Sequence, residues 1–475
     1  MSIFVLIVLI IILAVQLNSF LYTFYAVNYF LLFLFIGSRK KFDIVAKIES
    51  TKRIFFKGRL VIPNTYCKLL PLLVQLLIVS PLCFSQTTLK VATFNVSMES
   101  GNYEALVSNA KKIGTQFTNS AQEPLTGTKV LQHVLSTGEN PQVRNIAEII
   151  QRMNPDVLLL NEFDYIEDKA KGVDAFIANY LNVSQHGQPA VDYPYSYIAP
   201  VNTGIATPFD LDNNGKAEQI GADAQGFGLY PGHYGMAILS KYPIDVERIR
   251  TFQRFKWHHM PHPQKPFMQD GLEETPNARP WYNEKEWAAL RLSSKSHWDV
   301  PVLVNGETIH ILAMHPTPPT FDGAEDRNGK RNHDEIRFMA DYLSPDKGAY
   351  IYDDNNDKQS LYADANFVVM GDFNAADKGD KYRAGVIEQL IENPLVASDT
   401  VPKSLGGAES FDSEYSDRFT ASWGARVDYV LPSKGLNVLS SGVFWPSRKS
   451  ELYRLVENRN ASSDHRLVWV SISLP

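Results

Sequence analysis

Asp372 and Asn374 stand in the sequence Gly-Asp-Phe-Asn, directly after the short apolar run 367–370. A run of apolar and β-branched residues that stops at a glycine predicts a buried strand with a polar, exposed end. Because the two residues are two positions apart, an extended backbone would point both side chains the same way. A carboxylate beside a carboxamide suits a hard divalent cation and a phosphate oxygen. Asp-x-Asn is also common in turns, so the pattern gains weight only if it recurs.

The same design recurs five more times, with a polar residue where an apolar run stops or starts. Asn95 follows 89–94, Glu162 follows 157–160, His315 follows 309–314, Asp428 lies within 427–431, and Asp464 and His465 precede 467–470. Buried polar groups cost free energy unless they have partners. Gathering these side chains around one metal ion and around one another would supply the partners.

The elements that must position these residues are mostly strands. Strand-like runs cover 89–96, 157–160, 235–239, 308–314, 367–370, 426–431 and 467–474, and helical stripes of apolar residues cover 143–153 and 386–391. Many strands with few helices predict two packed sheets covered by helices. The polar, aromatic stretches 165–233, 250–300 and 345–365 are predicted to be long loops on one scaffold. We therefore expect a single domain over residues 86–475.

Taken in order, six short motifs resemble those of the endonuclease/exonuclease/phosphatase superfamily, which has the deoxyribonuclease-I-like fold. They are Phe94-Asn95, Asn161-Glu162, His315, Gly371-Asp372-Phe373-Asn374, Arg426-Val427-Asp428-Tyr429 and Ser463-Asp464-His465. Each motif is weak alone, but six in the family's order are specific. The resemblance implies an α/β fold, a four-layer αββα sandwich of two packed mixed β-sheets flanked by helices. It also implies hydrolysis of phosphate esters that depends on Mg²⁺ or Mn²⁺.

The resemblance also implies a role for each metal-binding residue. Glu162 matches the family's main metal ligand. Asn95 would help to hold the metal or its water, and Asp464 would lie beside the metal.

The catalytic residues follow from the same resemblance. Asp372 would orient or deprotonate the attacking water, and Asn374 would hold a phosphate oxygen. His465 is the candidate general base, with Asp428 fixing its tautomer. His315 would donate to a non-bridging phosphate oxygen as negative charge builds up. The division of labour between His465 and Asp372 is not uniform in the family and stays open.

Two further segments could bind ions. The basic stretch 326–334 could bind substrate phosphate through Arg327 and Arg331, or it could be the start of a solvated helix capped by Asn332. The residues Asp210, Asp212 and Asn214 have the spacing of the start of a calcium loop. Position twelve of that loop would be a glycine instead of a glutamate, so the segment is no EF-hand.

The first 85 residues have the pattern of an export leader. Residues 4–36 are almost all apolar, are long enough to span a bilayer and precede a basic cluster at 39–41. A second segment, 66–85, resembles a secretory signal with cleavage after about Ser85. Either 1–36 is a membrane anchor, or the chain begins too early and residues 1 to about 60 are translated upstream sequence. Both interpretations predict a secreted or periplasmic domain, which stays membrane-anchored only if 1–36 is retained.

Cysteine and charge limit the chemistry of the predicted domain. Both cysteines, Cys67 and Cys83, precede residue 86, so the domain has neither disulfides nor thiol chemistry. Nine of the 46 basic and two of the 52 acidic residues lie in the leader, which leaves 37 and 50 and a net charge of −13. An acidic body argues against broad affinity for nucleic acid, although a metal ion and a local basic patch can outweigh the mean.

The expected partner is therefore a phosphate-ester substrate, and no protein partner is predicted. Nuclease-type cleavage of a phosphodiester is slightly favoured, and a phospholipid phosphodiesterase or an inositol or nucleotide phosphatase is the alternative. The insertions 165–233 and 250–300 are expected to set the choice. A non-catalytic binding protein on the same scaffold would be expected to lack some ligand or base residues, and here all six motifs are present.

Overall fold

The computed structural model describes residues 87–103, 127–268 and 278–474. All of these belong to one compact unit, Ser85–Pro475, whereas the other unit, Met1–Phe84, lies outside them. The leader predictions therefore fall outside the described residues and stay predictions. No helix within the described ranges is both long and apolar enough to cross a membrane.

Two mixed β-sheets form the centre of the described unit. The six-stranded sheet has the order β10 (Asn437–Val443), β11 (Val468–Ser473), β1 (Thr88–Met98), β2 (Val157–Phe163), β4 (Met236–Ser240) and β3 (Tyr195–Tyr197). The five-stranded sheet has the order β5 (Arg250–Thr251), β6 (His297–Val304), β7 (Glu307–Met314), β8 (Asn366–Asp372) and β9 (Asp428–Pro432). The pairs β1–β2 and β7–β8 are parallel, and the other pairs are antiparallel.

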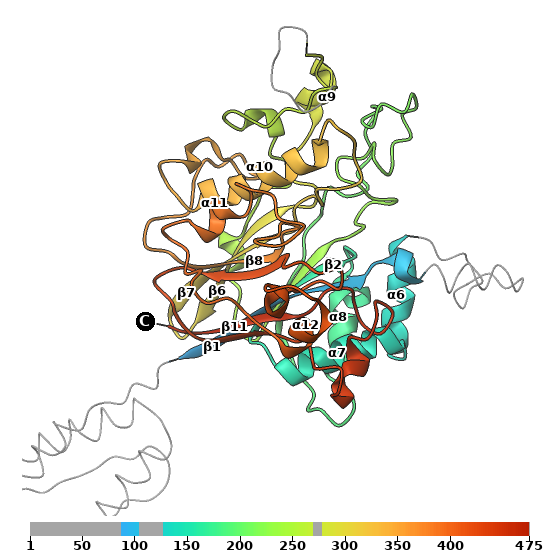
Figure 1. Cartoon of the computed structure of the whole chain (residues 1–475), viewed down its shortest axis with the longest axis vertical. Helices are drawn as coiled ribbons and strands as arrows, with labels where there is room; N and C mark the ends of the chain where they lie inside the picture. Colours follow the sequence, from blue (N-terminus) through green and yellow to red (C-terminus); the bar gives the residue numbers. More distant parts are fainter. Residues whose placement is uncertain (1–86, 104–126, 269–277, 475) are drawn as a thin grey trace, which may run out of the picture. The chain divides into compact units, whose positions relative to one another are not determined.

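Helices cover the outer faces of both sheets, as Figure 1 shows. On the six-stranded sheet lie α6 (Thr128–Thr137), α7 (Pro141–Met153) and α8 (Val173–Phe176). On the five-stranded sheet lie α10 (Arg327–Tyr342) and α11 (Glu388–Ile391), and two short helices, α9 (Glu284–Ala289) and α12 (Leu405–Ser410), belong to connecting segments. The predicted α/β sandwich of four layers is confirmed.

Helix α7 illustrates how the sequence builds a layer. Its apolar residues Val143, Ile146 and Ile150 recur at helical spacing and are fully buried against the six-stranded sheet. The side chain of Asn140 accepts a hydrogen bond from the backbone N–H of Val143, and a proline occupies the first turn. The helix predicted over 143–153 is confirmed.

Two predictions about these elements were wrong, and a third was confirmed only in part. Strand β6 begins within the stretch 250–300 that was predicted to be a loop. Asp299 and Pro301 interrupt the apolar pattern by which the strand could have been recognised. Helix α10 begins at Arg327, so Asn332 is no helix cap. It is buried within the helix and donates from its side-chain amide to the carbonyls of Thr317 and Phe373. The stripe 386–391 forms only the four-residue helix α11.

The strand directions bring all six motifs to one edge of the sandwich. The parallel strands β1 and β2 end beside each other, with Asn95 opposite Asn161. Strand β9 begins at the edge where β8 ends, so Asp428 lies opposite Asp372. Gly371 permits the close approach of β8 to β7, because its φ is 144° and a Cβ there would lie 2.0 Å from the Met314 carbonyl oxygen.

Candidate active site

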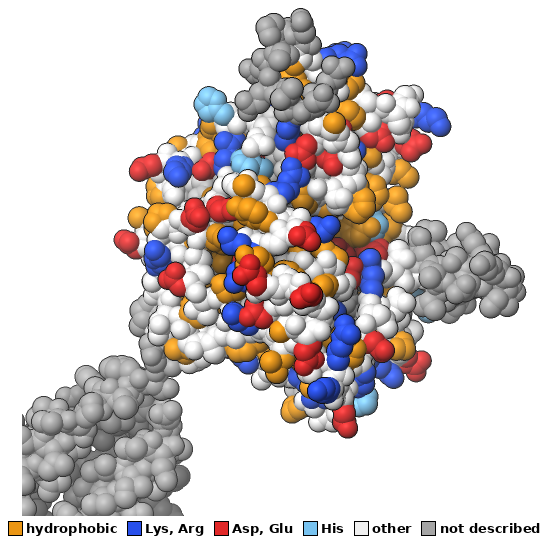
Figure 2. All heavy atoms as spheres, viewed as in Figure 1, with side chains coloured by type: hydrophobic (Ala, Val, Ile, Leu, Met, Phe, Trp, Pro, Cys, Tyr) orange, Lys and Arg blue, Asp and Glu red, His pale blue; other side chains and the backbone are white. Residues whose placement is uncertain are grey.

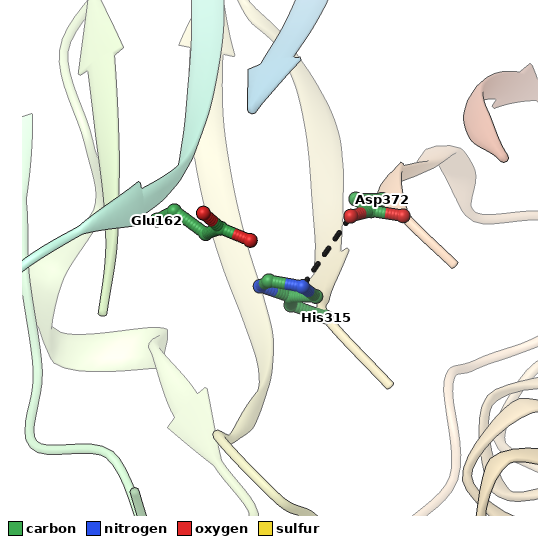
Figure 3. Close-up of side chains that lie close together, drawn as sticks. All are labelled: Glu162, His315 and Asp372. Atoms are coloured by element: carbon green, nitrogen blue, oxygen red, sulfur yellow. Dashed lines mark ion pairs between the residues drawn. The ribbon is translucent and has the colours of Figure 1, made fainter. Parts of the chain in front are cut away.

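Five of the predicted site residues converge at this edge. Ligand atoms of Glu162, His315 and Asp372 lie within 4.8 Å of one another, and so do those of Asp372, Asp428 and His465. Figure 3 shows the first group, in which Glu162 projects from β2 toward His315 and Asp372 at the ends of β7 and β8. Asp372 belongs to both groups and is their centre.

Glu162 has an unusual backbone. Its φ is +55°, a left-handed conformation that is rare for a residue inside a strand. Conformations of this kind cost about 1–3 kcal/mol and persist where the surroundings enforce them. Burial raises the pKa of the Glu162 carboxyl, and the charge of His465 and a hydrogen bond with Asn95 oppose that rise.

The other two predicted metal residues flank Glu162. The Asn95 side-chain amide donates to Asp372 Oδ2 at 3.1 Å, and its backbone carbonyl accepts from the Ser463 hydroxyl at 2.7 Å. Asp464 is partly exposed, accepts from the Ser97 hydroxyl at 3.1 Å and lies 3.5 Å from Arg459. Both residues are therefore fixed by partners on other strands.

His465 lies between two carboxylates. Its Nδ1 is 2.9 Å from Asp428 Oδ2, which also accepts from the Thr420 hydroxyl at 2.7 Å. Its Nε2 is 3.7 Å from Asp372 Oδ2. Within the described residues, the buried Oδ1 of Asp428 has no hydrogen-bond partner.

This arrangement controls the charge of the histidine. Burial disfavours the charged form, but Asp428 and Asp372 outweigh it and raise the pKa of His465 to about 10. Burial likewise disfavours a charge on Asp372, but His465 and His315 together hold the pKa of Asp372 below its ordinary value. The two carboxylates therefore favour the imidazolium form of His465.

His315 and Asn374 lie on the other side of Asp372. Nε2 of His315 is 3.4 Å from Asp372 Oδ2, and its buried Nδ1 has no hydrogen-bond partner within the described residues. Burial and the nearby charge of Lys295 lower the pKa of His315 to about 4, so the ring is neutral at physiological pH. The backbone N–H of Asn374 donates to Asp372 Oδ1 at 3.0 Å, and its side chain donates to the Pro316 carbonyl at 3.2 Å.

The two predicted phosphate-binding arginines have other contacts. Arg327 pairs with Glu325, and its guanidinium lies 5.2 Å from the ring centre of Trp281. Arg331 donates from Nε to the Leu292 carbonyl at 2.8 Å and from Nη2 to three further carbonyls. Those bonds give Arg331 a structural role. Phosphate binding by either arginine stays a prediction.

The predicted calcium loop gathers a different set of ligands from the one expected. Carboxylate oxygens of Asp210 and Asp212 lie within 4.8 Å of those of Asp223. Asp223 is eleven residues beyond Asp212, so the local spacing gives no sign of it. The backbone and side chain of Asn214 instead donate to the neighbouring carboxylates. Calcium binding there stays a prediction.

Other residues that support the site were missed as well. Asn161 joins the two sheets, since its Oδ1 accepts from the Thr93 hydroxyl at 3.1 Å and from the backbone N–H of Asp372 at 3.2 Å. Its position beside Glu162 was the available signal. Lys295 reaches the site from a polar stretch before β6, and nothing in its local sequence distinguishes it from a surface lysine.

Comparison with known proteins identifies the family. The model of the Endonuclease/Exonuclease/phosphatase family matches residues 92–465. The chain belongs to this family of hydrolases that act on phosphate esters. A search of curated protein sequences found no match.

Several solved structures are similar to the chain at low sequence identity. An endonuclease/exonuclease/phosphatase from Beutenbergia cavernae is 17% identical over 82% of this chain and 72% of its own, with a TM-score of 0.42. Sphingomyelinase C from Streptomyces griseocarneus is 14% identical over 82% of this chain and 100% of its own, with a TM-score of 0.37. A beta toxin variant from Staphylococcus aureus with bound magnesium ions is 13% identical over 81% and 99%, also with a TM-score of 0.37.

The residues at the site fit the divalent cation that such a hydrolase would use. The carboxylates of Glu162 and Asp464 and the amide oxygen of Asn95 are hard oxygen donors, the kind that Mg²⁺ and Mn²⁺ prefer. Glu162 is half-buried, and the partial loss of solvent that raises the pKa of its carboxyl is a cost that a bound cation would offset. The donor set is therefore consistent with one metal ion beside Glu162.

Proposed function

We propose that the protein is an exported, metal-dependent phosphoesterase that hydrolyses a phosphate ester by attack of water. The observation that carries this proposal is the convergence of Glu162, His315, Asp372, Asp428 and His465 at one edge of the sandwich. Within this class, nuclease-type cleavage of a phosphodiester is slightly favoured, and a phospholipid phosphodiesterase or an inositol or nucleotide phosphatase is the alternative. Export rests on the leader sequence alone.

Glu162, with Asn95 and Asp464, would hold Mg²⁺ or Mn²⁺. When bound, the ion supplies positive charge to the phosphate oxygens and a Lewis acid for the reaction. The strained backbone of Glu162 supports a functional role, because strain of this kind concentrates at functional sites.

The proton of the attacking water goes to Asp372 or to His465. Oδ2 of Asp372 and Nε2 of His465 are 3.7 Å apart, so a single water can contact both. Asp428 holds the other ring nitrogen of His465 and so fixes the orientation of the ring. His465 acts as base only after it has lost the proton that the two carboxylates favour; otherwise Asp372 takes the proton and His465 stabilises the phosphate by its charge.

The non-bridging oxygens of the phosphate would meet neutral donors. The Asn374 amide has a second N–H besides the one that it donates to the Pro316 carbonyl. The neutral ring of His315 has a single N–H, which would go to the phosphate from Nδ1 if it is not donated from Nε2 to Asp372. Such donors contribute most where negative charge grows in the transition state. They therefore support turnover more than ground-state binding.

Substrate choice is argued from the surface. On the face seen in Figure 2, basic and acidic side chains are interleaved without a continuous basic area. The described unit lies within a stretch that carries 37 basic and 50 acidic residues. A substrate would therefore be held chiefly by its phosphate at the site, which leaves a nucleic acid, a phospholipid, an inositol phosphate or a nucleotide open.

The test is a substrate panel assayed with the full chain purified in detergent and supplied with Mg²⁺. DNA, RNA, sphingomyelin, inositol phosphates and nucleotides would each be incubated with the wild type and with Asp372→Asn. We expect hydrolysis of one class at least ~10²-fold faster than with the variant, because the variant removes the carboxylate shared by both groups. A folded protein that hydrolyses no phosphate ester would overturn the proposal.

Export is tested separately with a reporter fused at residue 86. We expect the reporter to leave the cytoplasm only when residues 61–85 precede it. If residues 1–36 are also required and stay attached to the reporter, the protein is membrane-anchored and the interpretation of a premature start is wrong.

A further inference from the structure

Lys295 is a buried lysine beside the site, and no motif assigns it a role. Its side chain lies just before β6, and the residue is only 5% exposed. Within the described residues, no hydrogen bond or salt bridge holds its ammonium group. The nitrogen itself is not fully buried, so the ammonium is reachable from solvent and has donors left for a ligand.

The backbone around Lys295 is fixed on three sides. The Ser294 N–H donates to Glu335 Oε1 at 2.6 Å, and the Ser294 hydroxyl contacts the His315 carbonyl at 3.5 Å. The Lys295 carbonyl accepts from the backbone N–H of Asn202 at 2.9 Å, a contact from the insertion 165–233. Lys295 is thus tied to the loop that carries His315 and cannot move away freely.

The insertion also encloses this position. Gly226 packs on the Ser294 carbonyl so closely that an added Cβ would lie 2.0 Å from the oxygen. Only a glycine permits this approach, and the approach covers the segment that carries Lys295. The insertion therefore contributes to the burial of the lysine at the site.

Two of the three carboxylates near Lys295 belong to the site. Burial lowers the pKa of Lys295, whereas Glu335, Glu162 and Asp372 are close enough to raise it. Lys295 in turn helps to lower the pKa of His315. Glu335 is already engaged, since its carboxylate accepts the backbone N–H groups of Ser294 and Thr317, each at 2.6 Å.

Other buried cations in the described chain have close acceptors. Arg426 pairs with Asp377 at 2.9 Å, and Arg466 donates to the carbonyls of Ser463, His465 and Val456 at 2.8–2.9 Å. Lys295 has positive charge without such acceptors, and it lies next to residues that would bind a phosphate. An anionic ligand oxygen is the acceptor that it lacks.

We propose that Lys295 contacts a non-bridging phosphate oxygen of the substrate and, with His315, stabilises the charge that develops on it. This inference rests on the proposed function. Lys295 would then be a catalytic residue that the insertion 165–233 covers and whose backbone that insertion holds in place. The group that it recognises is an anionic phosphoryl oxygen, whatever the rest of the substrate.

The test compares Lys295→Met and Lys295→Gln with Lys241→Met in the full chain. Lys241 is a matched control, because it is partly exposed, pairs with Asp156 at 3.1 Å and lies at the opposite ends of β2 and β4. Binding of inorganic phosphate with Mg²⁺ present is measured by calorimetry, and kcat and KM are measured with bis(p-nitrophenyl) phosphate or the substrate from the panel. Thermal unfolding without ligand reports on folding.

We expect both Lys295 variants to lose at least ~10-fold in phosphate affinity and ~10²-fold in kcat/KM, as for a lost charged contact to a transition state. Lys241→Met should match the wild type. Wild-type phosphate affinity and turnover in a folded Lys295 variant would overturn the assignment, and so would a fall in unfolding temperature without a change in either. If Lys295→Met does not fold, Lys295→Gln, which keeps a polar end, supplies the readout. Absence of hydrolysis by the wild type would instead overturn the proposed function.

Discussion

Two buried histidine–aspartate pairs in this molecule have similar chemistry and different surroundings. In one pair, His465 Nδ1 lies 2.9 Å from Asp428. In the other, His310 Nδ1 lies 2.6 Å from Asp299, between β7 and β6. Burial alone does not separate them, since His465 is 4% and His310 6% exposed.

The difference lies in the remaining polar atoms. His310 Nε2 contacts the Tyr362 hydroxyl at 3.2 Å, and the second oxygen of Asp299 accepts from the Tyr342 hydroxyl at 2.7 Å. In the His465 pair, by contrast, Nε2 is 3.7 Å from Asp372 Oδ2, which is too far for a hydrogen bond. We call this pair open and the His310 pair closed.

A pair whose polar atoms all have hydrogen-bond partners is structural, whereas a pair with an atom left without a close partner can react. Nearly all buried polar groups in folded proteins are hydrogen-bonded, so an unpartnered group at a strand end points to a ligand. By this criterion the Asp299 network stabilises the sheet. The His465, His315 and Lys295 side chains instead have hydrogen-bonding capacity left for a substrate.

The largest difference is expected between His465→Ala and His310→Ala. His465→Ala should lower kcat by at least ~10²-fold, the scale of lost acid–base catalysis. It should also lower the unfolding temperature, because Asp428 and Asp372 lose a buried partner. His310→Ala should leave kcat within a few-fold and lower the free energy of unfolding by about 1–3 kcal/mol, because Asp299 loses a buried partner. Steady-state kinetics and urea denaturation measure both. Equal losses of activity would contradict the division between an open and a closed pair.

A double-mutant cycle sharpens the assignment within the open pair. Asp428→Asn should lower kcat severely, since the amide can stabilise the wrong tautomer of His465. The variant with Asp428→Asn and His465→Ala should be little worse than the worse single variant, because the two residues act as one unit. Circular dichroism checks that each variant is folded. Multiplicative losses would show that the two residues act independently and would favour Asp372 as the base.

A smaller effect is expected from His297, a closed and buried histidine behind the site. It lies 3.1 Å from the Ser293 hydroxyl and 3.0 Å from the Glu335 carbonyl, and burial lowers its pKa to about 4. The unfolded chain, with a pKa near 6.5, binds this proton more readily. Stability from the neutral ring is therefore complete above pH 6.5 and is lost as the pH falls toward 4, by about 3 kcal/mol.

His297→Gln should flatten that part of the stability curve. The free energy of unfolding, measured by denaturant titration from pH 7 to 4, should fall less steeply for the variant than for the wild type. Identical slopes would show that the histidine is not held neutral by its surroundings.

Much of the site was predictable because its residues stand at the ends of apolar runs. Asn95, Glu162 and Asp372 follow strands whose direction brings their ends to one edge. The pattern of strand and polar end is local, so it can be read from the sequence. The four-layer arrangement followed from the resemblance and from the number of strands.

The missed parts depend on contacts between distant segments. Strand β6 carries Asp299, which is tolerated in a buried strand only because His310 and Tyr342 contact it. Lys295 becomes part of the site only because an insertion about 90 residues earlier in the chain covers it. Neither contact leaves a local signal that composition or periodicity could detect.

The most direct test of the account is the metal dependence of hydrolysis in the wild type and in Glu162→Gln. The active substrate from the panel is assayed with excess chelator and then across a Mg²⁺ and Mn²⁺ titration. We expect activity to vanish with chelator and to return with either metal, and Glu162→Gln to need a far higher concentration because it keeps the shape and removes the charge. Full activity of the wild type in excess chelator, or an unchanged metal requirement in Glu162→Gln, would contradict the account.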